Sequence, residues 1–109
     1  MISIHKETES ALLLNLNTRE ANLVNADEFK AEIISLFDEH QKKIILNLKQ
    51  VEYIDSSFLG ALVGVLKHLL SFKSDLILVG LHKDIINLFK MIRLDKVFKI
   101  YDSFDELPA

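Results

Sequence analysis

The chain has 109 residues and a net charge of −3 at neutral pH, and half of its residues are hydrophobic, which predicts one globular domain over residues 1–109. The charge balance lacks the basic footprint typical of nucleic-acid binding, and the absence of cysteine excludes disulfides and thiolate metal sites. The longest apolar stretch, residues 58–66, is far shorter than the ~20 residues of a membrane span, and the N-terminus lacks the pattern of a signal peptide, so we expect a cytoplasmic protein with no membrane contact.

The first two predicted strands form a hairpin at one edge of a sheet. Residues 2–7 alternate apolar and polar side chains, which is typical of an edge strand, and residues 11–16 are rich in leucine. Residues 8–10 make only a short connection between them. We therefore expect these two strands to pair antiparallel.

A polar stretch then leads into the first predicted helix, at about residues 26–39. Its apolar side chains recur at helical spacing and would share one face: Phe29, Ile33, Leu36 and Phe37. Asn25 is the expected N-cap residue. Asp27 and Glu28 would then lie in the first turn, where negative charge is favourable.

The rest of the chain alternates predicted strands and helices. Buried strands are expected at residues 43–48 and 76–79, and a short last strand at residues 97–101. Helices are expected at residues 57–70 and around the apolar stripe of Ile85, Leu88, Phe89 and Ile92, with one helical turn at residues 104–107 before Pro108. Strands that alternate with helices imply right-handed crossovers. We predict an α/β fold with a mostly parallel sheet of about five strands, an N-terminal antiparallel hairpin and three to four helices.

An acid and two hydroxyls, Asp55, Ser56 and Ser57, mark the point where a strand hands over to a helix. A helix N-terminus has unpaired backbone N–H groups and a partial positive charge, so it tolerates phosphate well. A serine at this place is a plausible phosphorylation switch. Asp and Ser before a helix are also the commonest N-cap residues, and the residues alone leave both interpretations open.

The helix that follows carries small residues on one side. On a helical wheel an apolar arc from Phe58 to Leu70 occupies one side, and the opposite side carries Ser57, Gly60, Ala61, Gly64, His68 and Ser71. Each glycine inside a helix costs ~1 kcal/mol relative to alanine, so two of them call for a reason. Either the face packs closely on a neighbouring element of the same domain, or it is a docking surface for a partner protein.

The order and spacing of three segments carry a family resemblance. Residues 51–60 read Val-Glu-Tyr-Ile-Asp-Ser-Ser-Phe-Leu-Gly after an apolar strand, which is similar to the pattern V-x-x-[IM]-D-S-[ST]-G-[LI]-G. Residues 76–81 look like a fourth strand and turn, and residues 88–101 look like a third helix and last strand. Together these segments resemble the STAS family, in particular the bacterial anti-sigma-factor antagonists. The likeness covers nearly the whole chain and implies a single STAS domain over residues 1–109.

The resemblance implies a regulator that works by binding another protein, with no enzymatic activity, cofactor or metal. In that family the serine directly after the aspartate is phosphorylated. Here that serine is Ser56, with Ser57 as the alternate because the wheel points it outward. Asp55 and Phe58 would form the switch loop, and Ser57, Gly60, Ala61 and Gly64 the docking face, with Phe58 at its edge.

The implied partners are a serine kinase that is itself the anti-sigma factor and a PP2C-type phosphatase. The unphosphorylated antagonist would bind the kinase and free the sigma factor, and the phosphatase would restore that form. We expect the protein to be a monomer or a weak dimer.

Two departures from the family pattern favour an alternative. Phe58 replaces the usual glycine after the serines, and Arg19-Glu20-Ala21-Asn22 stands where the family has G-x-L-D, so Asn22 replaces an acid. The alternative is a STAS module that is never phosphorylated and acts as an adaptor in a signalling scaffold or a transporter-associated complex. Such a module would need neither the glycine after the serines nor the acid at position 22. Retention of Asp55, Ser56 and Ser57 favours the switch.

Other classes of protein lack support in the sequence. A receiver domain needs an acidic pair after its early strands to hold Mg²⁺, and this chain has Asn15, Asn17 and Asn22 there. The nucleophile elbow G-x-S-x-G of a serine hydrolase is absent. His68 lies roughly 18 Å along the helix from Ser56, which is too far for proton transfer.

Overall fold

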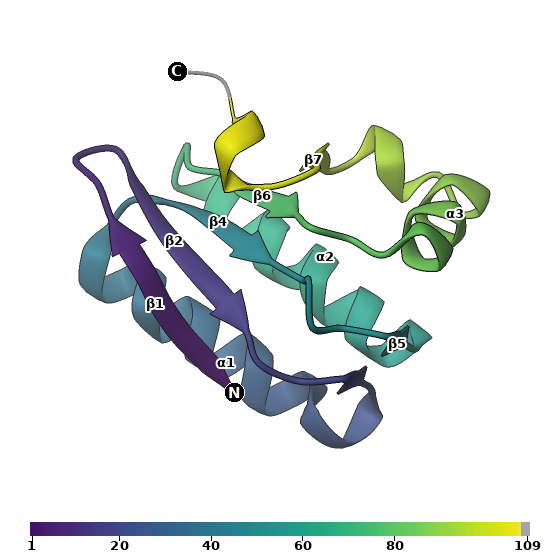
Figure 1. The fold of residues 1–109 in the computed structure, drawn as a ribbon. Coiled ribbons are helices and arrows are strands. Elements are labelled where there is room, and N and C mark those ends of the chain that lie inside the picture. The colour runs from purple at the N-terminus through teal and green to yellow at the C-terminus, as the bar shows by residue number, and fades with distance from the viewer. Residues whose placement is uncertain (108–109) are drawn as a thin grey trace.

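The computed structural model describes residues 1–107 and contains a five-stranded mixed sheet with the strand order β1-β2-β4-β6-β7 (Figure 1). Its strands are β1 (Ile2–Glu7), β2 (Ala11–Leu16), β4 (Lys43–Asn47), β6 (Leu76–Val79) and β7 (Lys99–Tyr101). β1 pairs antiparallel with β2, and the other three pairings are parallel. The predicted α/β class, the parallel sheet and the antiparallel hairpin at its edge are confirmed.

A second, two-stranded sheet was not predicted. Its strands are β3 (Glu20–Ala21) and β5 (Tyr53–Ile54), which pair in parallel. The carbonyl of Arg19 accepts hydrogen bonds from the backbone amides of Glu52 at 2.8 Å and Tyr53 at 3.1 Å. Each strand is too short to show an alternating pattern in the sequence, but together they bring residues 20–22 beside residues 53–55.

Three α-helices join the strands: α1 (Leu23–His40), α2 (Ser56–Ser71) and α3 (Lys83–Met91). Two short 3-10 turns follow, η1 (Leu94–Lys96) and η2 (Phe104–Glu106). In Figure 1, α1 and α2 lie side by side against the same face of the sheet. The turn expected before Pro108 is present as η2, and Pro108 itself lies outside the described residues.

The start of α1 differs from the expectation. The helix begins at Leu23 and its N-cap is Asn22, whose Oδ1 accepts a hydrogen bond from the amide of Val24 at 3.0 Å. Asn25 is the third helical residue and closes a capping box, because its Oδ1 accepts from the Asn22 amide at 2.9 Å. Asp27 and Glu28 therefore lie beyond the first turn, and placing them there was wrong. With the cap at Asn22, the first-turn amides of Val24 and Leu23 donate to the side chains of Asn22 and Asp55.

Strand periodicity divides the apolar core into two clusters. On one face the strand side chains pack against α1 and α2, and they include Leu12, Leu14, Ile44, Leu46, Leu76 and Leu78. The alternate positions on the other face form a smaller cluster of Ala11, Leu13, Ile45, Ile77 and Val79. Tyr101, Phe104 and Leu107 of the C-terminal segment pack against this second cluster. The two faces therefore differ in what covers them.

The last strand is shorter than expected. Residues 94–96 turn into η1, so β7 begins at Lys99 rather than at residue 97. Arg93, which lies between α3 and η1, adopts a left-handed conformation with φ of 66°. The chain turns at this residue into η1. None of the helices within residues 1–107 has the length and apolarity required to cross a bilayer.

Candidate functional site

The carboxylate of Asp55 joins the first turns of two helices. Asp55 is the N-cap of α2, and its Oδ1 accepts a hydrogen bond from the amide of Phe58 at 2.9 Å. Its Oδ2 accepts from the amide of Leu23, the first residue of α1, at 2.9 Å. The Asp55 amide also donates to the carbonyl of Ala21 at 3.0 Å. One side chain thus satisfies an otherwise unpaired amide in each helix and holds both N-termini at one place.

Ser56 and Ser57 differ in accessibility. Ser56 is the first residue of α2 and is exposed, whereas Ser57 is half-buried. Both hydroxyls lie at the N-terminus of a 16-residue helix, where the helix dipole and first-turn amides favour an anion. The geometry leaves the Ser56 hydroxyl the more open of the two to a modifying enzyme.

Phe58 is not at the edge of an exposed surface, and that expectation was wrong. Its side chain is 0% exposed, and its ring centroid lies 4.5 Å from that of Phe29 on α1. The third residue of α2 points into the interface with α1, on the same face as Leu62 and Val65, which are also buried. The large side chain that replaces the family's glycine therefore fills the core and leaves the surface near Ser56 clear.

The small-residue face of α2 is divided rather than continuous. Gly60 is exposed, and a Cβ there would have no heavy atom within 4 Å. Ala61 is buried with 9% exposure, so its assignment to an outward face was wrong. At Gly64 a Cβ would lie 2.9 Å from Nζ of Lys30, whose side chain crosses from α1 and covers this part of the helix. Ala61 belongs to the buried core and Lys30 of α1 covers Gly64, while Ser57 is half-buried and Gly60 is open.

Three exposed apolar side chains near Ser56 were missed by the sequence analysis. Leu23 is 71% exposed, Val24 is 90% exposed and Tyr53 is 54% exposed. Leu23 is tied directly to Asp55, and Tyr53 precedes it by two residues on β5. The signal in the sequence is that Leu23 and Val24 fall off the apolar stripe of α1. Exposed apolar groups gathered around one point are typical of a protein-binding surface.

An ion pair borders this surface. Nε of Arg19 lies 2.7 Å from Oε2 of Glu52, so the two strands of the small sheet are linked through side chains as well as backbone. The hydrogen bond and the charge of Arg19 lower the pKa of Glu52 below its usual value, and Glu52 in turn raises the pKa of Arg19. Both groups are exposed, so the pair adds little to stability.

The histidines do not join this site. His68 lies towards the other end of α2, with its ring 6.2 Å from Phe37 and 5.1 Å from Phe72. His82 contacts the carbonyl of Lys49. Within residues 1–107, no three side chains of His, Cys, Asp and Glu are grouped so that they could hold a metal ion.

Comparisons with known proteins agree on the fold and its family. The STAS domain family model matches residues 5–107. A candidate anti-sigma factor antagonist of Thermotoga neapolitana is 34% identical over 103 residues, which cover 94% of this chain and 90% of that protein. The crystal structure of a candidate anti-sigma factor antagonist from Thermotoga maritima is 31% identical, covers 86% of this chain and 82% of its own, and superposes with a TM-score of 0.77.

A more distant structure has the same fold. The Bacillus cell-fate determinant SpoIIAA in its phosphorylated form superposes with a TM-score of 0.71 at 18% identity. The match covers 97% of this chain and 95% of that chain. At this level of identity the likeness supports the architecture alone.

Proposed function

This chain belongs to the STAS domain family as an anti-sigma-factor-antagonist-like domain, and we propose that it binds a serine kinase that is also an anti-sigma factor and leaves it when Ser56 is phosphorylated. In this role the protein works by binding and carries out no chemistry of its own. Binding of the unphosphorylated form would release the sigma factor held by the kinase. A PP2C-type phosphatase would return the phosphorylated form to the binding state in the cytoplasm.

The observation that carries the proposal is the position of Ser56. Ser56 is exposed and is the first residue of α2. The neighbouring Asp55 carboxylate already accepts hydrogen bonds from the amides of Phe58 and Leu23. Asp55 therefore orders the segment without occupying the serine hydroxyl. Ser57 is half-buried, which favours Ser56 as the modified residue and keeps Ser57 as the alternate.

We define the switch surface as Leu23, Val24, Tyr53, Ser57 and Gly60, which surround Ser56. A partner that binds here would bury the exposed apolar side chains and would approach closely at Gly60, where no side chain intervenes. Phosphate would add a charge of about −1.5 to −2 next to Asp55. Because the partner would have to desolvate this dianion, binding would weaken without any change of fold.

The adaptor that is never phosphorylated is the second candidate function, and one observation now weighs less in its favour. Phe58, the first departure from the family pattern, has its side chain buried against Phe29. Asn22, the other departure, serves as the N-cap of α1. Neither residue then obstructs a kinase at Ser56.

The test has two parts. Mass spectrometry of the protein recovered from its own cells, with and without stress, should find phosphate on Ser56 that changes with the condition. Binding to each serine-kinase anti-sigma factor encoded in the same genome should be lost with Ser56→Asp and retained with Ser35→Asp, a matched exposed serine on α1. Absence of phosphate at good peptide coverage, together with equal binding of both variants, would favour the adaptor.

A further inference from the structure

The sheet face that points away from α1 and α2 is covered by a short C-terminal segment rather than by long helices. Its apolar side chains are packed against by three residues of the C-terminal segment, Tyr101, Phe104 and Leu107, whereas the other face receives two long helices. Figure 1 shows η2 above one end of this face. Parallel sheets usually have both faces buried by helices. The strand side chains of this face are at most 8% exposed, so a ligand here would lie in the opening that the C-terminal segment leaves.

A groove of about 410 Å³ runs along this face, within the range of ~300–1,000 Å³ that small-molecule sites have. Leu13, Ile45 and Ile77 line it, and they form one row, because Leu13 is the register partner of Ile45 and Ile45 is that of Ile77. Leu107 and Tyr101 also line it. These side chains form the apolar part of the lining, and Thr8, Ser10, Lys43 and Lys99 form the polar part.

The mouth of the groove is positively charged. Lys43, at the start of β4, and Lys99, at the start of β7, line it together with Ser10. Nζ of Lys99 lies 3.0 Å from Oδ2 of Asp75, which raises the pKa of Lys99. Lys43 makes no ion pair or side-chain hydrogen bond with any residue in the described part of the chain. Its ammonium is free to meet an anion.

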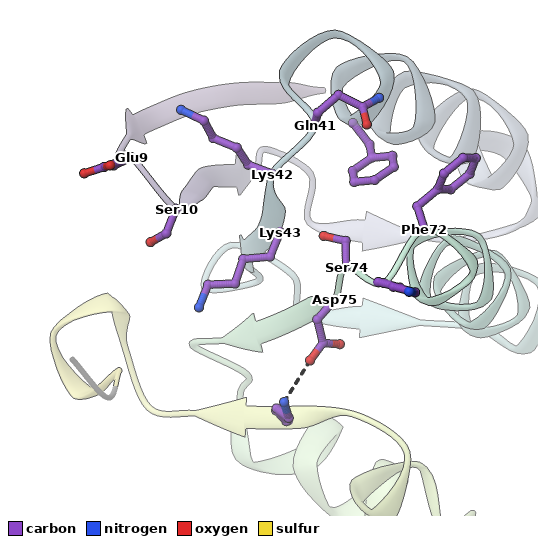
Figure 2. A pocket seen from close by; sticks show the side chains of 11 residues that line it. Glu9, Ser10, Gln41, Lys42, Lys43, Phe72, Ser74 and Asp75 are labelled. Carbon is purple, nitrogen blue, oxygen red and sulfur yellow. Dashed lines mark ion pairs between the residues drawn. The ribbon is translucent and has the colours of Figure 1, made fainter.

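A second cavity adjoins this mouth. It has a volume of about 660 Å³ and shares Ser10, Lys43 and Lys99 with the groove. It adds Lys42 and Lys73 and also the carboxylates of Glu9 and Asp75. Figure 2 shows Lys43 between Ser10 and Asp75, the residue that pairs with Lys99. Lys42 pairs with Glu7 and Lys99 pairs with Asp75, so within residues 1–107 Lys43 is the unpaired lysine in the lining of the groove. This combination complements a ligand with an apolar chain and a negatively charged head.

We propose that this groove binds an amphipathic small-molecule anion, with its apolar chain along Leu13, Ile45 and Ile77 and its anionic head at Lys43. A partner helix fits less well, because a helix with its side chains is about 10–12 Å across and needs an open face rather than a groove walled by the C-terminal segment. The site is separate from the switch surface. Lys43 and Lys99 lie at the end of the sheet that is near the C-terminus of α2. This end of α2 is roughly 24 Å along the helix from Ser56.

The probe is decanoate, and its binding to the full chain is measured by NMR of isotope-labelled methyl groups. Saturable shifts are expected for the methyl signals of Leu13, Ile45 and Ile77, and much smaller ones for Leu12 and Ile44, which face α1 and α2. Decanol lacks the charge and acetate lacks the chain, so each should bind at least severalfold more weakly. If no saturable shift is seen with decanoate, or if acetate matches it, the proposal is overturned.

Two lysine variants locate the anionic head. Lys43→Gln should weaken decanoate binding about two- to fivefold, the effect of losing one exposed ion pair. Lys73→Gln is the matched control, because Lys73 lines the adjoining cavity but not the groove, and it should leave the affinity unchanged. Equal affinity of the two variants would overturn the assignment of Lys43. Shifts of the same methyl groups with an acidic amphipathic peptide, and none with decanoate, would show a protein-docking face instead.

Discussion

The carboxylate of Asp55 accepts a hydrogen bond from the amide of Leu23, so the N-terminus of α1 is anchored to the residue that caps α2. The two residues lie 32 positions apart in the chain, and the small sheet of β3 and β5 brings them together. The same carboxylate stands next to Ser56. Asp55 therefore positions both the proposed phosphorylation site and the exposed apolar side chains at the start of α1.

Replacement of Asp55 should destabilise the domain. Asp55→Ala removes the acceptors for the amides of Phe58 and Leu23, and we expect a loss of about 1–3 kcal/mol in the free energy of unfolding. Asp55→Asn keeps one carbonyl oxygen and should lose less. Urea denaturation followed by circular dichroism measures both. A loss below about 0.5 kcal/mol for Asp55→Ala would contradict the double capping.

An acid at Ser56 should leave stability intact. Ser56 is the first residue of α2, where a negative charge interacts favourably with the helix dipole by about 0.3–1 kcal/mol. Repulsion from Asp55 offsets part of that gain, so the melting temperature of Ser56→Asp should stay close to that of the natural protein. The measurement is thermal unfolding at low and high salt. A melting temperature lowered by many degrees would mean that lost partner binding reflects unfolding.

Phe58 should behave as a core residue. Phe58→Ala is expected to cost about 3–5 kcal/mol because it empties the space beside Phe29. Tyr53→Ala, on the exposed switch surface, should change the free energy of unfolding by less than about 0.5 kcal/mol while weakening partner binding. Denaturation and a binding assay on the two variants separate core from surface. Similar stability losses in both would contradict this division.

The two glycines of α2 should respond differently to substitution. Gly60→Ala meets no neighbouring atom and should raise the free energy of unfolding by about 0.5–1 kcal/mol. Gly64→Leu must displace the flexible end of Lys30, so the domain should still fold. Its free energy of unfolding should rise less than that of Gly60→Ala or fall modestly. Denaturation curves test both. Complete unfolding by Gly64→Leu would show that this part of the helix lies in a rigid core.

Acid should weaken the contacts at the end of the hairpin. Oε2 of Glu7 lies 2.9 Å from Nζ of Lys42 and 3.0 Å from Nδ1 of His40, and the hydrogen bonds from Lys42 and then His40 lower the pKa of Glu7 from its usual 4.5. A lowered carboxyl pKa contributes stability above pH 4.5 that is lost as the pH falls through the folded-state value.

Glu7→Gln should therefore lose a small amount of stability at neutral pH and show a shallower decline below pH 4.5. High salt should reduce the difference, since the pair is exposed. Glu28→Gln, an exposed residue of α1, is the control and should keep the pH dependence of the natural protein. Identical pH profiles for Glu7→Gln and the natural protein would contradict a role for this contact.

The sequence predicted most of the fold because the relevant signals are local. Alternation in residues 2–7 and the leucine-rich run after it indicate strands, although β1 is largely exposed and β2 is buried on both faces. The stripe of Phe29, Ile33 and Phe37 marks the buried side of α1. The order of these elements then restricts the sheet to parallel crossovers. The small strands β3 and β5 were not predicted, because a two-residue strand is too short to show a periodic pattern.

The candidate site was only partly predictable. Asp55 and Ser56 could be placed at a helix start from the sequence, because a strand followed by an apolar helical run sets that boundary. Which side chains surround them could not, since a helical wheel describes one helix without its neighbours. The wheel grouped Ala61 with Gly60, but Ala61 is buried in the core cluster and Gly60 is open.

By itself, the sequence determined the class of fold, a helix predicted to start at residue 57 and the family to which the chain is similar, because hydrophobic periodicity and motif spacing are properties of short segments. In the structure this helix begins one residue earlier, at Ser56. Only the tertiary structure decided that Phe58 packs on Phe29, that Lys30 lies over Gly64 and that Asp55 reaches Leu23. Each of these contacts joins residues more than 25 positions apart. Such contacts depend on how α1 packs on α2, and the packing of two helices follows from the whole core rather than from either segment.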